Sequence, residues 1–199
     1  MEFTTVFLFI AIFASILILP GPNAAFAVGQ SLKYGVVGSL VVPLGFMTAT
    51  VLHAALVFSG IGLVMQEYSI ILSVLKWLGV LYLLYLACKS FVAKPSHIDI
   101  TQQAIPMLKM YLSALFVSLT NPKALLASFM VYPLFLNTEE SYVIQAVILS
   151  SAAMVISFVI YGSYSLAAVT LKNRFKSNKS QNKLMGGLYI SAASMLASK

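Results

Sequence analysis

The chain reads Leu19-Pro20-Gly21-Pro22-Asn23-Ala24 within its first apolar run and Leu119-Thr120-Asn121-Pro122-Lys123-Ala124 within a later one. These two stretches decide the fold. Proline lacks the backbone N–H that would bond the carbonyl four residues earlier, so a helix that contains proline bends or breaks. The sequence therefore predicts two helices that are interrupted near their middles.

The runs around these breaks are long enough to cross a membrane. Of the 199 residues, 60% are hydrophobic and only 9% are charged, whereas a soluble domain carries about 25% charged residues. A spanning helix needs about 20 apolar residues, and continuous runs differ from the alternating pattern of barrel strands. We therefore expect an all-α, polytopic integral membrane protein. Its six transmembrane helices are predicted at Phe3 to Leu19 continuing to Gln30, Gly38 to Met65, Ser69 to Phe91, Leu108 to Leu136, Tyr142 to Leu171, and Leu184 to Ala197.

The first run has an alternative interpretation as a cleaved signal peptide, because Ala25-Phe26-Ala27 resembles a small-x-small cleavage site. Two features favour a membrane span instead. The charge before the run is the acidic Glu2, where a signal peptide has basic residues. The run is also longer than the typical signal core of about 7 to 15 residues.

The two halves of the chain show a weak internal repeat. The two break stretches share Leu, Pro and Ala, and a second pair of stretches, around Lys76 to Tyr82 and Lys183 to Tyr189, shares the pattern Lys-x-x-Gly-x-Leu-Tyr. Each half holds three predicted spans, and an odd number of crossings inverts the second half relative to the first. We expect one transporter domain over residues 1–199, an inverted three-plus-three repeat with halves of about 1–98 and 104–199 and with broken helices one and four.

The basic residues predict the orientation. Six spans place nine of them on one side of the membrane: Lys33, Lys89, Lys94, Lys109, Lys172, Arg174, Lys176, Lys179 and Lys183. The other side receives Lys76 and Lys199 together with Glu2, Glu67, Glu139 and Glu140. By the positive-inside rule, both termini are predicted outside the cytoplasm. Topology alone accounts for the basic stretch from Lys172 to Lys183, so no nucleic-acid partner is expected.

The predicted breaks offer groups of both signs to a ligand. Each new half-helix begins with N–H groups that carry positive partial charge, and each preceding half-helix ends in carbonyls that carry negative partial charge. Together they suit a zwitterion such as an amino acid. The candidate binding residues here are Pro20, Gly21, Pro22, Asn23, Asn121 and Pro122. The alternative is that the prolines only kink packed helices, with Asn and Ser side chains satisfying the backbone.

Lys123 is the most unusual residue of the second break. A charge at the centre of a membrane helix costs about 2.5 to 3.5 kcal/mol on insertion scales, and the predicted spans contain no Asp or Glu. The possible forms of relief are water in a cavity, backbone carbonyls or an anionic ligand. We therefore expect Lys123 to bind substrate.

Further polar residues in the second and fifth spans are weaker candidates. His53 could bind cargo or relay protons near neutral pH, or it could be a packed residue bonded to a carbonyl. A polar path is predicted to be lined by Thr48 and Thr50 in the second span and by Ser157, Tyr161 and Tyr164 in the fifth. Hydroxyl groups also bond their own helix, which is the alternative for each of them.

The ordered set of motifs resembles the LysE/RhtB-type amino-acid exporter family. The motifs are Pro20 to Ala24, Gly45 to His53, Leu75 to Leu86 and Leu119 to Ala124, and the resemblance covers nearly the whole chain. It implies a bacterial inner-membrane exporter of amino acids or their derivatives, driven by the membrane potential or a proton gradient. Family members often carry an acidic residue at places that here hold Thr50 and Ser157, which argues against a carboxylate proton relay and leaves His53, water or uniport as the alternatives.

The sequence leaves two function classes open. The first is amino-acid export by alternating access, and the alternative is transport of a small cation or metal ion through the broken helices. An enzyme is not expected, because no metalloprotease, serine-hydrolase, Cys-x-x-Cys or phosphate-loop motif occurs. We expect no cofactor and no resident metal, the lipid bilayer as the solvent, and homo-oligomerisation as an open possibility.

Overall fold

The computed structural model describes residues 1–60, 69–92, 106–137, 139–171 and 178–197. All regular structure in these residues is helical, as the composition predicts. The helices are α1 (Phe3–Ile18), α2 (Pro22–Tyr34), α3 (Val36–Phe58), α5 (Ser69–Val92), α6 (Met107–Leu119), α7 (Pro122–Leu134), α8 (Tyr142–Leu171) and α9 (Asn178–Ala197).

Both predicted helix breaks are present. The axes of α1 and α2 differ by 65°, and those of α6 and α7 differ by 60°. Extended backbone at Leu19 and Gly21 separates the first pair, and Pro22 then occupies the first position of α2, where its missing N–H costs nothing. Asn121 caps α7 with its side chain, directly before Pro122. The breaks therefore end one helix and start another instead of only kinking a continuous one.

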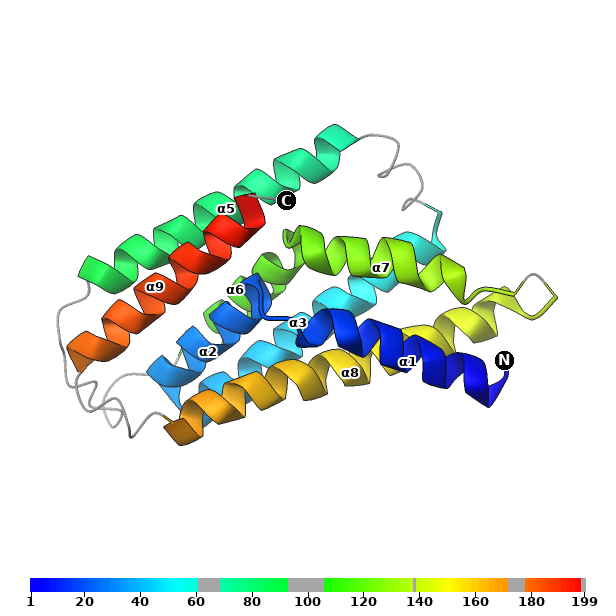
Figure 1. The fold of residues 1–199 in the computed structure, drawn as a ribbon, viewed down its shortest axis with the longest axis horizontal. Helices are drawn as coiled ribbons and strands as arrows, with labels where there is room; N and C mark the ends of the chain where they lie inside the picture. The colour runs from blue at the N-terminus through cyan, green and yellow to red at the C-terminus, as the bar shows by residue number, and fades with distance from the viewer. Residues whose placement is uncertain (61–68, 93–105, 138, 172–177, 198–199) are drawn as a thin grey trace.

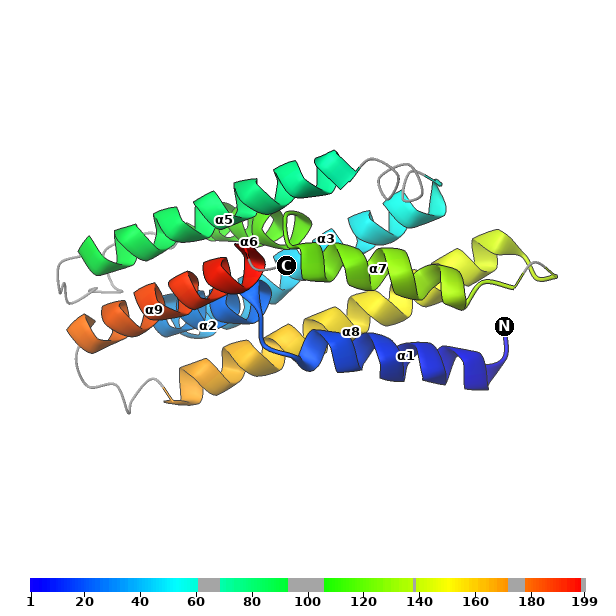
Figure 2. The ribbon, with the colours of Figure 1, turned by 45° about the horizontal axis from the view of Figure 1, so that its top comes forward.

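The helices run along the long axis of the molecule in alternating directions (Figure 1). The pair α1 and α2 leads from the N-terminal end to the opposite end, α3 returns, and α5 runs back again. The pair α6 and α7, then α8 and α9, repeat the alternation with the opposite starting direction (Figures 1 and 2). Helix α3 packs along α8, and helix α5 packs along α9.

The charged residues separate toward the two ends of this bundle. Lys33 and Lys89 lie in the last turns of α2 and α5, which finish at the same end of the molecule, called the basic end below (Figure 1). At the other end, the acidic end, the Met1 amino group forms an ion pair with the Glu140 carboxylate at 2.7 Å. The distribution agrees with the separation that the sequence predicts.

The outer faces of the helices are apolar. Leu81, Val147 and Leu166 each have more than half of their side-chain surface exposed, which suits a lipid environment. By length and composition, α3 and residues Tyr142–Thr170 of α8 can each cross a membrane, and the number of candidate spans rises to four when each bent pair counts as one. The six predicted spans therefore stay a prediction.

Two helices have ends that differ from the predicted spans, because a helix can continue beyond an apolar run or stop within it. The helix α9 begins at Asn178, although the apolar run was expected to begin at Leu184, because its first turns are polar but still helical. The helix α3 ends at Phe58, before Gly60 with its φ of 78°, so the described helix stops short of the predicted end at Met65. Residues 61–68, which contain that predicted end, lie outside the described residues.

Candidate functional site

The two helix breaks meet in the interior through a pair of asparagines. The Asn121 Nδ2 atom donates a hydrogen bond to Asn23 Oδ1 at 2.8 Å, and Asn23 Nδ2 donates to the Ser118 hydroxyl at 3.0 Å. All three side chains are at least 98% buried. We call Asn23, Ser118 and Asn121 the junction. It connects residues about 100 positions apart in the chain.

Local sequence explains why these amides point inward. Asn23 is in the first turn of α2, directly after the proline that starts the helix. Asn121 is the N-cap of α7, and its Oδ1 atom accepts the Lys123 backbone N–H at 3.1 Å. Asparagine is among the preferred N-cap residues because its side-chain oxygen satisfies a free N–H of the first turn. The Asn121 side-chain oxygen thus caps α7, while its side-chain nitrogen bonds Asn23 of α2.

The carbonyls at the end of α1 receive donors from the second half of the chain. The Tyr164 hydroxyl of α8 donates to the Ile18 carbonyl at 2.5 Å, and the Lys123 ammonium donates to the Leu19 carbonyl. A cation at a helix C-terminus is favourable because the unpaired carbonyls carry negative partial charge. Backbone carbonyls are therefore the relief that Lys123 finds, one of the three that the sequence allowed.

Gly21 and Pro22 are buried beside this contact, whereas Pro20 is exposed. A Cβ atom at Gly21 would lie 3.5 Å from Lys123 Cδ and 3.8 Å from its Nζ, so the two breaks touch here as well. Of the predicted residues in the first break, Gly21 and Asn23 contact the second break. Pro20 shapes the chain without facing it.

His53 and Tyr161 lie next to the junction. The His53 imidazole bonds the backbone of Leu119, its Nε2 atom has no hydrogen-bond partner among the described residues, and the side chain is 99% buried. The Tyr161 hydroxyl interacts with the Asn23 side chain. Both residues therefore connect α3 and α8 to the two breaks. His53 keeps one nitrogen available to a polar ligand.

Thr48 has different neighbours. Its hydroxyl donates to the Leu44 carbonyl of its own helix at 3.1 Å and accepts from the Tyr111 hydroxyl at 2.8 Å. The structure thus connects Thr48 to α6 and not to the junction. Thr50 likewise donates to the Phe46 carbonyl of its own helix. Both follow the alternative in which hydroxyl groups bond their own helix.

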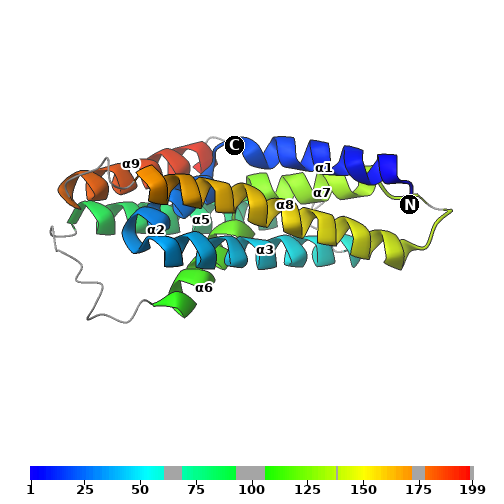
Figure 3. The same cartoon turned by 90° about the horizontal axis from the view of Figure 1, so that it is seen from below.

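Aromatic side chains cover the junction on both sides along the long axis. The acidic-end cluster contains Phe9, Phe13, Phe58, Tyr132, Phe135 and Tyr142, with ring centroids 5.1 to 5.8 Å apart. The basic-end cluster contains Phe26, Phe46, Tyr161 and Tyr189, with centroids 4.9 to 6.2 Å apart. Helices α1 and α7 contribute only to the first cluster and lie toward the acidic end, whereas α2 and α9 contribute only to the second and lie toward the basic end (Figure 3).

The described residues also include buried polar groups that no other described residue satisfies. Among the residues that the structure describes, no group of three or more His, Cys, Asp or Glu side chains could hold a metal ion. The Ser157 and Tyr132 hydroxyls are buried without hydrogen-bond partners in the described part of the chain. Such groups can bond a small polar molecule, and each one left unpaired costs free energy.

Ser118 is the junction residue whose side-chain hydroxyl was not predicted from the sequence to take part in the site. It lies one helical turn before Asn121, so the spacing of a hydroxyl three residues before a helix break was a usable signal. The Tyr164 contact with Ile18 had no comparable signal, because it joins residues of different helices that only the packing brings together.

Comparison with known proteins finds bacterial efflux proteins that match over most of the chain. The homoserine/homoserine lactone efflux protein of Salmonella typhimurium is 26% identical over 183 residues, which cover 90% of this chain and 89% of that protein. The leucine efflux protein of the same organism is 26% identical over 190 residues, covering 92% and 89%. The leucine efflux protein of Enterobacter sp. is 29% identical over 194 residues, covering 92% and 90%. No solved structure matches.

A match to a protein-family model confirms the family resemblance that the sequence motifs indicate. The family described as LysE type translocator matches residues 14–199, which include both breaks and all junction residues. Translocators are transporters and not enzymes, as the absence of catalytic motifs predicts. The protein belongs to the LysE type translocator family.

Proposed function

We propose that this protein exports a small zwitterionic amino acid or amino-acid derivative across the bacterial inner membrane by alternating access. The observation that carries the proposal is the meeting of the two broken helices at the junction, with Lys123 bound to the last carbonyls of α1. The relatives that cover most of the chain are named as efflux proteins for leucine and for homoserine and its lactone, which supports an amino-acid substrate.

The contacts at the junction suggest how such a substrate binds. A carboxylate is a stronger partner for the Lys123 ammonium than the Leu19 carbonyl is, because both members of the pair are then charged. When the substrate carboxylate takes Lys123, the Leu19 carbonyl is released and can accept the substrate ammonium. The half-helix N-termini at Pro22 and Pro122 add positive partial charge on the carboxylate side. A single change of partners thereby provides Lys123 for the substrate carboxylate and the Leu19 carbonyl for the substrate ammonium.

The surroundings favour a substrate whose side chain is uncharged. The described acidic residues are Glu2, Glu139 and Glu140, which lie at the acidic end and not at the junction. A cationic side chain would find no carboxylate there. The buried neighbours are instead hydroxyl, amide, imidazole and aromatic groups, which suit apolar or neutral polar side chains.

Helix contacts support six crossings arranged as an inverted repeat within one domain of residues 1–199. If α1, α2, α3 and α5 correspond to α6, α7, α8 and α9, then the contact of α1 with α8 corresponds to that of α6 with α3. The contact of α2 with α8 corresponds to that of α7 with α3, and all four contacts occur. The pairs α3 with α8 and α5 with α9 are their own counterparts. This pattern is typical of a pseudo-two-fold axis in the membrane plane.

Alternating access then assigns a role to the two aromatic clusters. We infer that each cluster is a gate, and that opening one while the other stays closed exposes the junction to one side at a time. With the basic end in the cytoplasm, as the positive-inside rule requires, substrate enters through the basic-end cluster and leaves through the acidic-end cluster. Both termini are then outside the cytoplasm.

The experiment compares flux of labelled amino acids from proteoliposomes that contain wild-type protein, Lys123→Ala or Lys183→Ala. Lys183 is an exposed lysine of α9 and serves as the matched control. A hydrogen bond to a charged group contributes about 1.5 to 3 kcal/mol, so Lys123→Ala is expected to reduce flux about tenfold to a hundredfold at equal protein. The control should retain wild-type flux.

The panel includes leucine and homoserine, because relatives are named for their efflux, and it adds other neutral and charged amino acids. Equal flux by wild-type protein and Lys123→Ala would contradict the assigned role of Lys123. Metal-ion flux without flux of any amino acid would support ion transport and overturn the proposal.

A further inference from the structure

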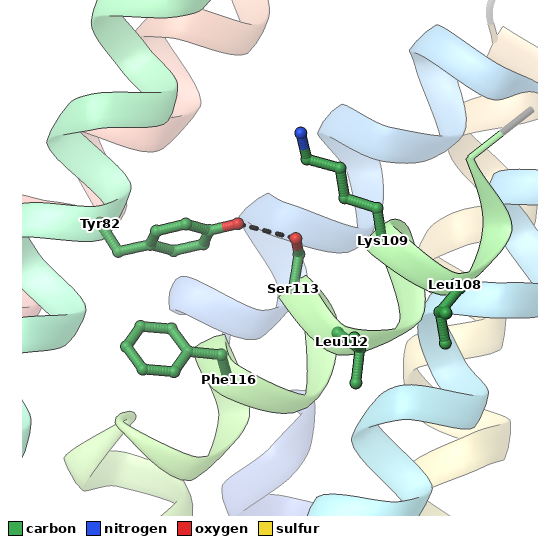
Figure 4. Close-up of a pocket in the computed structure, with 6 residues that line it drawn as sticks. All are labelled: Tyr82, Leu108, Lys109, Leu112, Ser113 and Phe116. Atoms are coloured by element: carbon green, nitrogen blue, oxygen red, sulfur yellow. Dashed lines mark hydrogen bonds between the residues drawn. The ribbon is translucent and has the colours of Figure 1, made fainter.

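A shallow hollow on the surface between α5 and α6 is separate from the junction. It has a volume of about 480 Å³ and is lined by Tyr82, Leu108, Lys109, Leu112, Ser113 and Phe116 (Figure 4). None of these residues belongs to the junction or to either aromatic cluster. The hollow is therefore separate from the proposed path of the transported substrate.

Its walls are apolar because their polar groups bond each other. The Tyr82 hydroxyl donates to the Ser113 hydroxyl at 2.8 Å, across the space between the two helices (Figure 4). The Tyr82 ring also meets the Phe116 ring edge-on, with centroids 5.3 Å apart. Leu108 and Leu112 are at least half exposed. An acyl chain fits such walls, because it needs no hydrogen-bonding partner.

One end of the hollow is positively charged. Lys109 is exposed in the first turn of α6, on the other side of the Tyr82–Ser113 bond from Phe116 (Figure 4). Helix α6 starts at Met107 after Pro106, and within the described part of the chain no side chain caps its N-terminus. A lysine together with free N–H groups at a helix start attracts an anion such as a phosphate. None of the described carboxylates pairs with Lys109.

The length of the hollow matches one leaflet of a bilayer. From Leu108 to Phe116 the helix rises about 12 Å, and half of the hydrocarbon core is about 15 Å thick. The charged end belongs to the start of α6, which lies toward the basic end of the bundle, where a cytoplasmic leaflet rich in anionic headgroups is expected. The positive charge thus lies where a lipid headgroup would be, and the apolar walls lie where an acyl chain would be.

We propose that this hollow is a binding site for one anionic phospholipid. The headgroup phosphate lies at Lys109 and the start of α6, and one acyl chain runs along Leu112 toward Phe116. Bound there, the lipid contacts both α5 and α6, which touch each other far less than α5 touches α9 or α6 touches α3. It therefore adds a link between α5 and α6.

The test measures the melting temperature of the purified full chain in detergent with added dioleoyl phosphatidylglycerol or dioleoyl phosphatidylcholine. A ligand that binds only the folded state raises its stability by mass action. We expect phosphatidylglycerol to raise the melting temperature more than phosphatidylcholine does. Lys109→Gln should remove at least half of that difference, and Leu112→Gln should reduce the shift with both lipids.

Matched controls come from other exposed positions. Lys183→Gln and Leu166→Gln change the same residue types on α9 and α8, and both should keep the wild-type shifts. The proposal is overturned if wild-type protein does not prefer phosphatidylglycerol, or if both hollow variants behave like their controls. Native mass spectrometry adds a second reading: a dimer that Leu112→Gln dissociates, without an adduct of one lipid, would assign the hollow to a contact between two copies and overturn the lipid site.

Discussion

At the residue scale, side chains from the second half of the chain satisfy two carbonyls at the end of α1. The Ile18 and Leu19 carbonyls bond Tyr164 and Lys123, and the amides of Asn23 and Asn121 bond each other. In hydrocarbon an unsatisfied backbone group costs several kcal/mol, because no solvent replaces the missing partner. The first break is therefore stable only when the second half of the chain is in place.

Removing the Tyr164 hydroxyl measures this dependence. Tyr164→Phe leaves the Ile18 carbonyl without its donor, and we expect a loss of about 1 to 3 kcal/mol in stability because water does not reach the middle of a bilayer. Tyr142→Phe is the matched control, since the Tyr142 hydroxyl donates to the Phe58 carbonyl at 2.6 Å at the end of a span. There, interfacial water can take the place of the hydroxyl. Thermal unfolding in lipid nanodiscs should show the larger decrease for Tyr164→Phe, and equal decreases would contradict a central position of the break.

The residues that sequence alone could identify are those whose chemistry is unusual for their place. Lys123 is a charge within an apolar run, and Asn23 and Asn121 flank prolines, so each was predicted at the breaks. Their partners were not predictable, because the Lys123 contact with Leu19 depends on how two distant segments pack. Thr48 shows the opposite case: its polarity suggested the polar path, yet the packing connects it to Tyr111.

At the element scale, small residues set how closely the helices approach. A Cβ atom at Gly45 of α3 would lie 2.7 Å from the Tyr111 carbonyl oxygen and 2.8 Å from the Ala114 Cβ of α6. Backbone atoms cannot move aside as the end of a flexible side chain can. The contact between the second span and the first half of the second broken helix therefore requires glycine at this position.

Gly45→Ala should separate α3 from α6. Overpacking a filled interior costs about 1 to 3 kcal/mol, so we expect a lower melting temperature than that of wild-type protein. Gly162→Ala is the control, because nothing lies within 4 Å of a Cβ atom at Gly162 of α8, and alanine is the better helix former by about 1 kcal/mol. An unchanged melting temperature for Gly45→Ala would show that the two helices are not held at this distance.

Element boundaries were predictable where proline or a sharp change in polarity marks them. The fifth predicted span coincides with α8, and the third differs from α5 by one residue at its C-terminus. The start of α9 was not predictable from hydropathy, since a polar segment such as Asn178 to Lys183 can be helical outside the hydrocarbon layer. Hydropathy reports where the lipid is, whereas helix formation continues into the interface.

At the scale of the whole molecule, the alternating directions of the helices and the separation of charge have one explanation. Lys33 and Lys89 finish their helices at the basic end, and Glu140 holds the Met1 amino group at the acidic end. Each half of the chain contributes helices to both ends. A two-gate transporter needs this arrangement, because each gate must be formed by elements of both halves that move relative to each other.

The orientation of the bundle can be measured with single cysteines in a Cys88→Ser background, since Cys88 is exposed and would react. We expect an impermeant maleimide added to intact cells to label Glu139→Cys, because in the orientation proposed above the acidic end faces away from the cytoplasm. Lys183→Cys should be labelled only after the inner membrane is permeabilised, because the basic end is retained inside by the positive-inside rule. Both positions are exposed, so a missing label reports the membrane barrier and not burial. The reverse pattern would place the basic end outside, and the direction of gating proposed above would then have to be inverted.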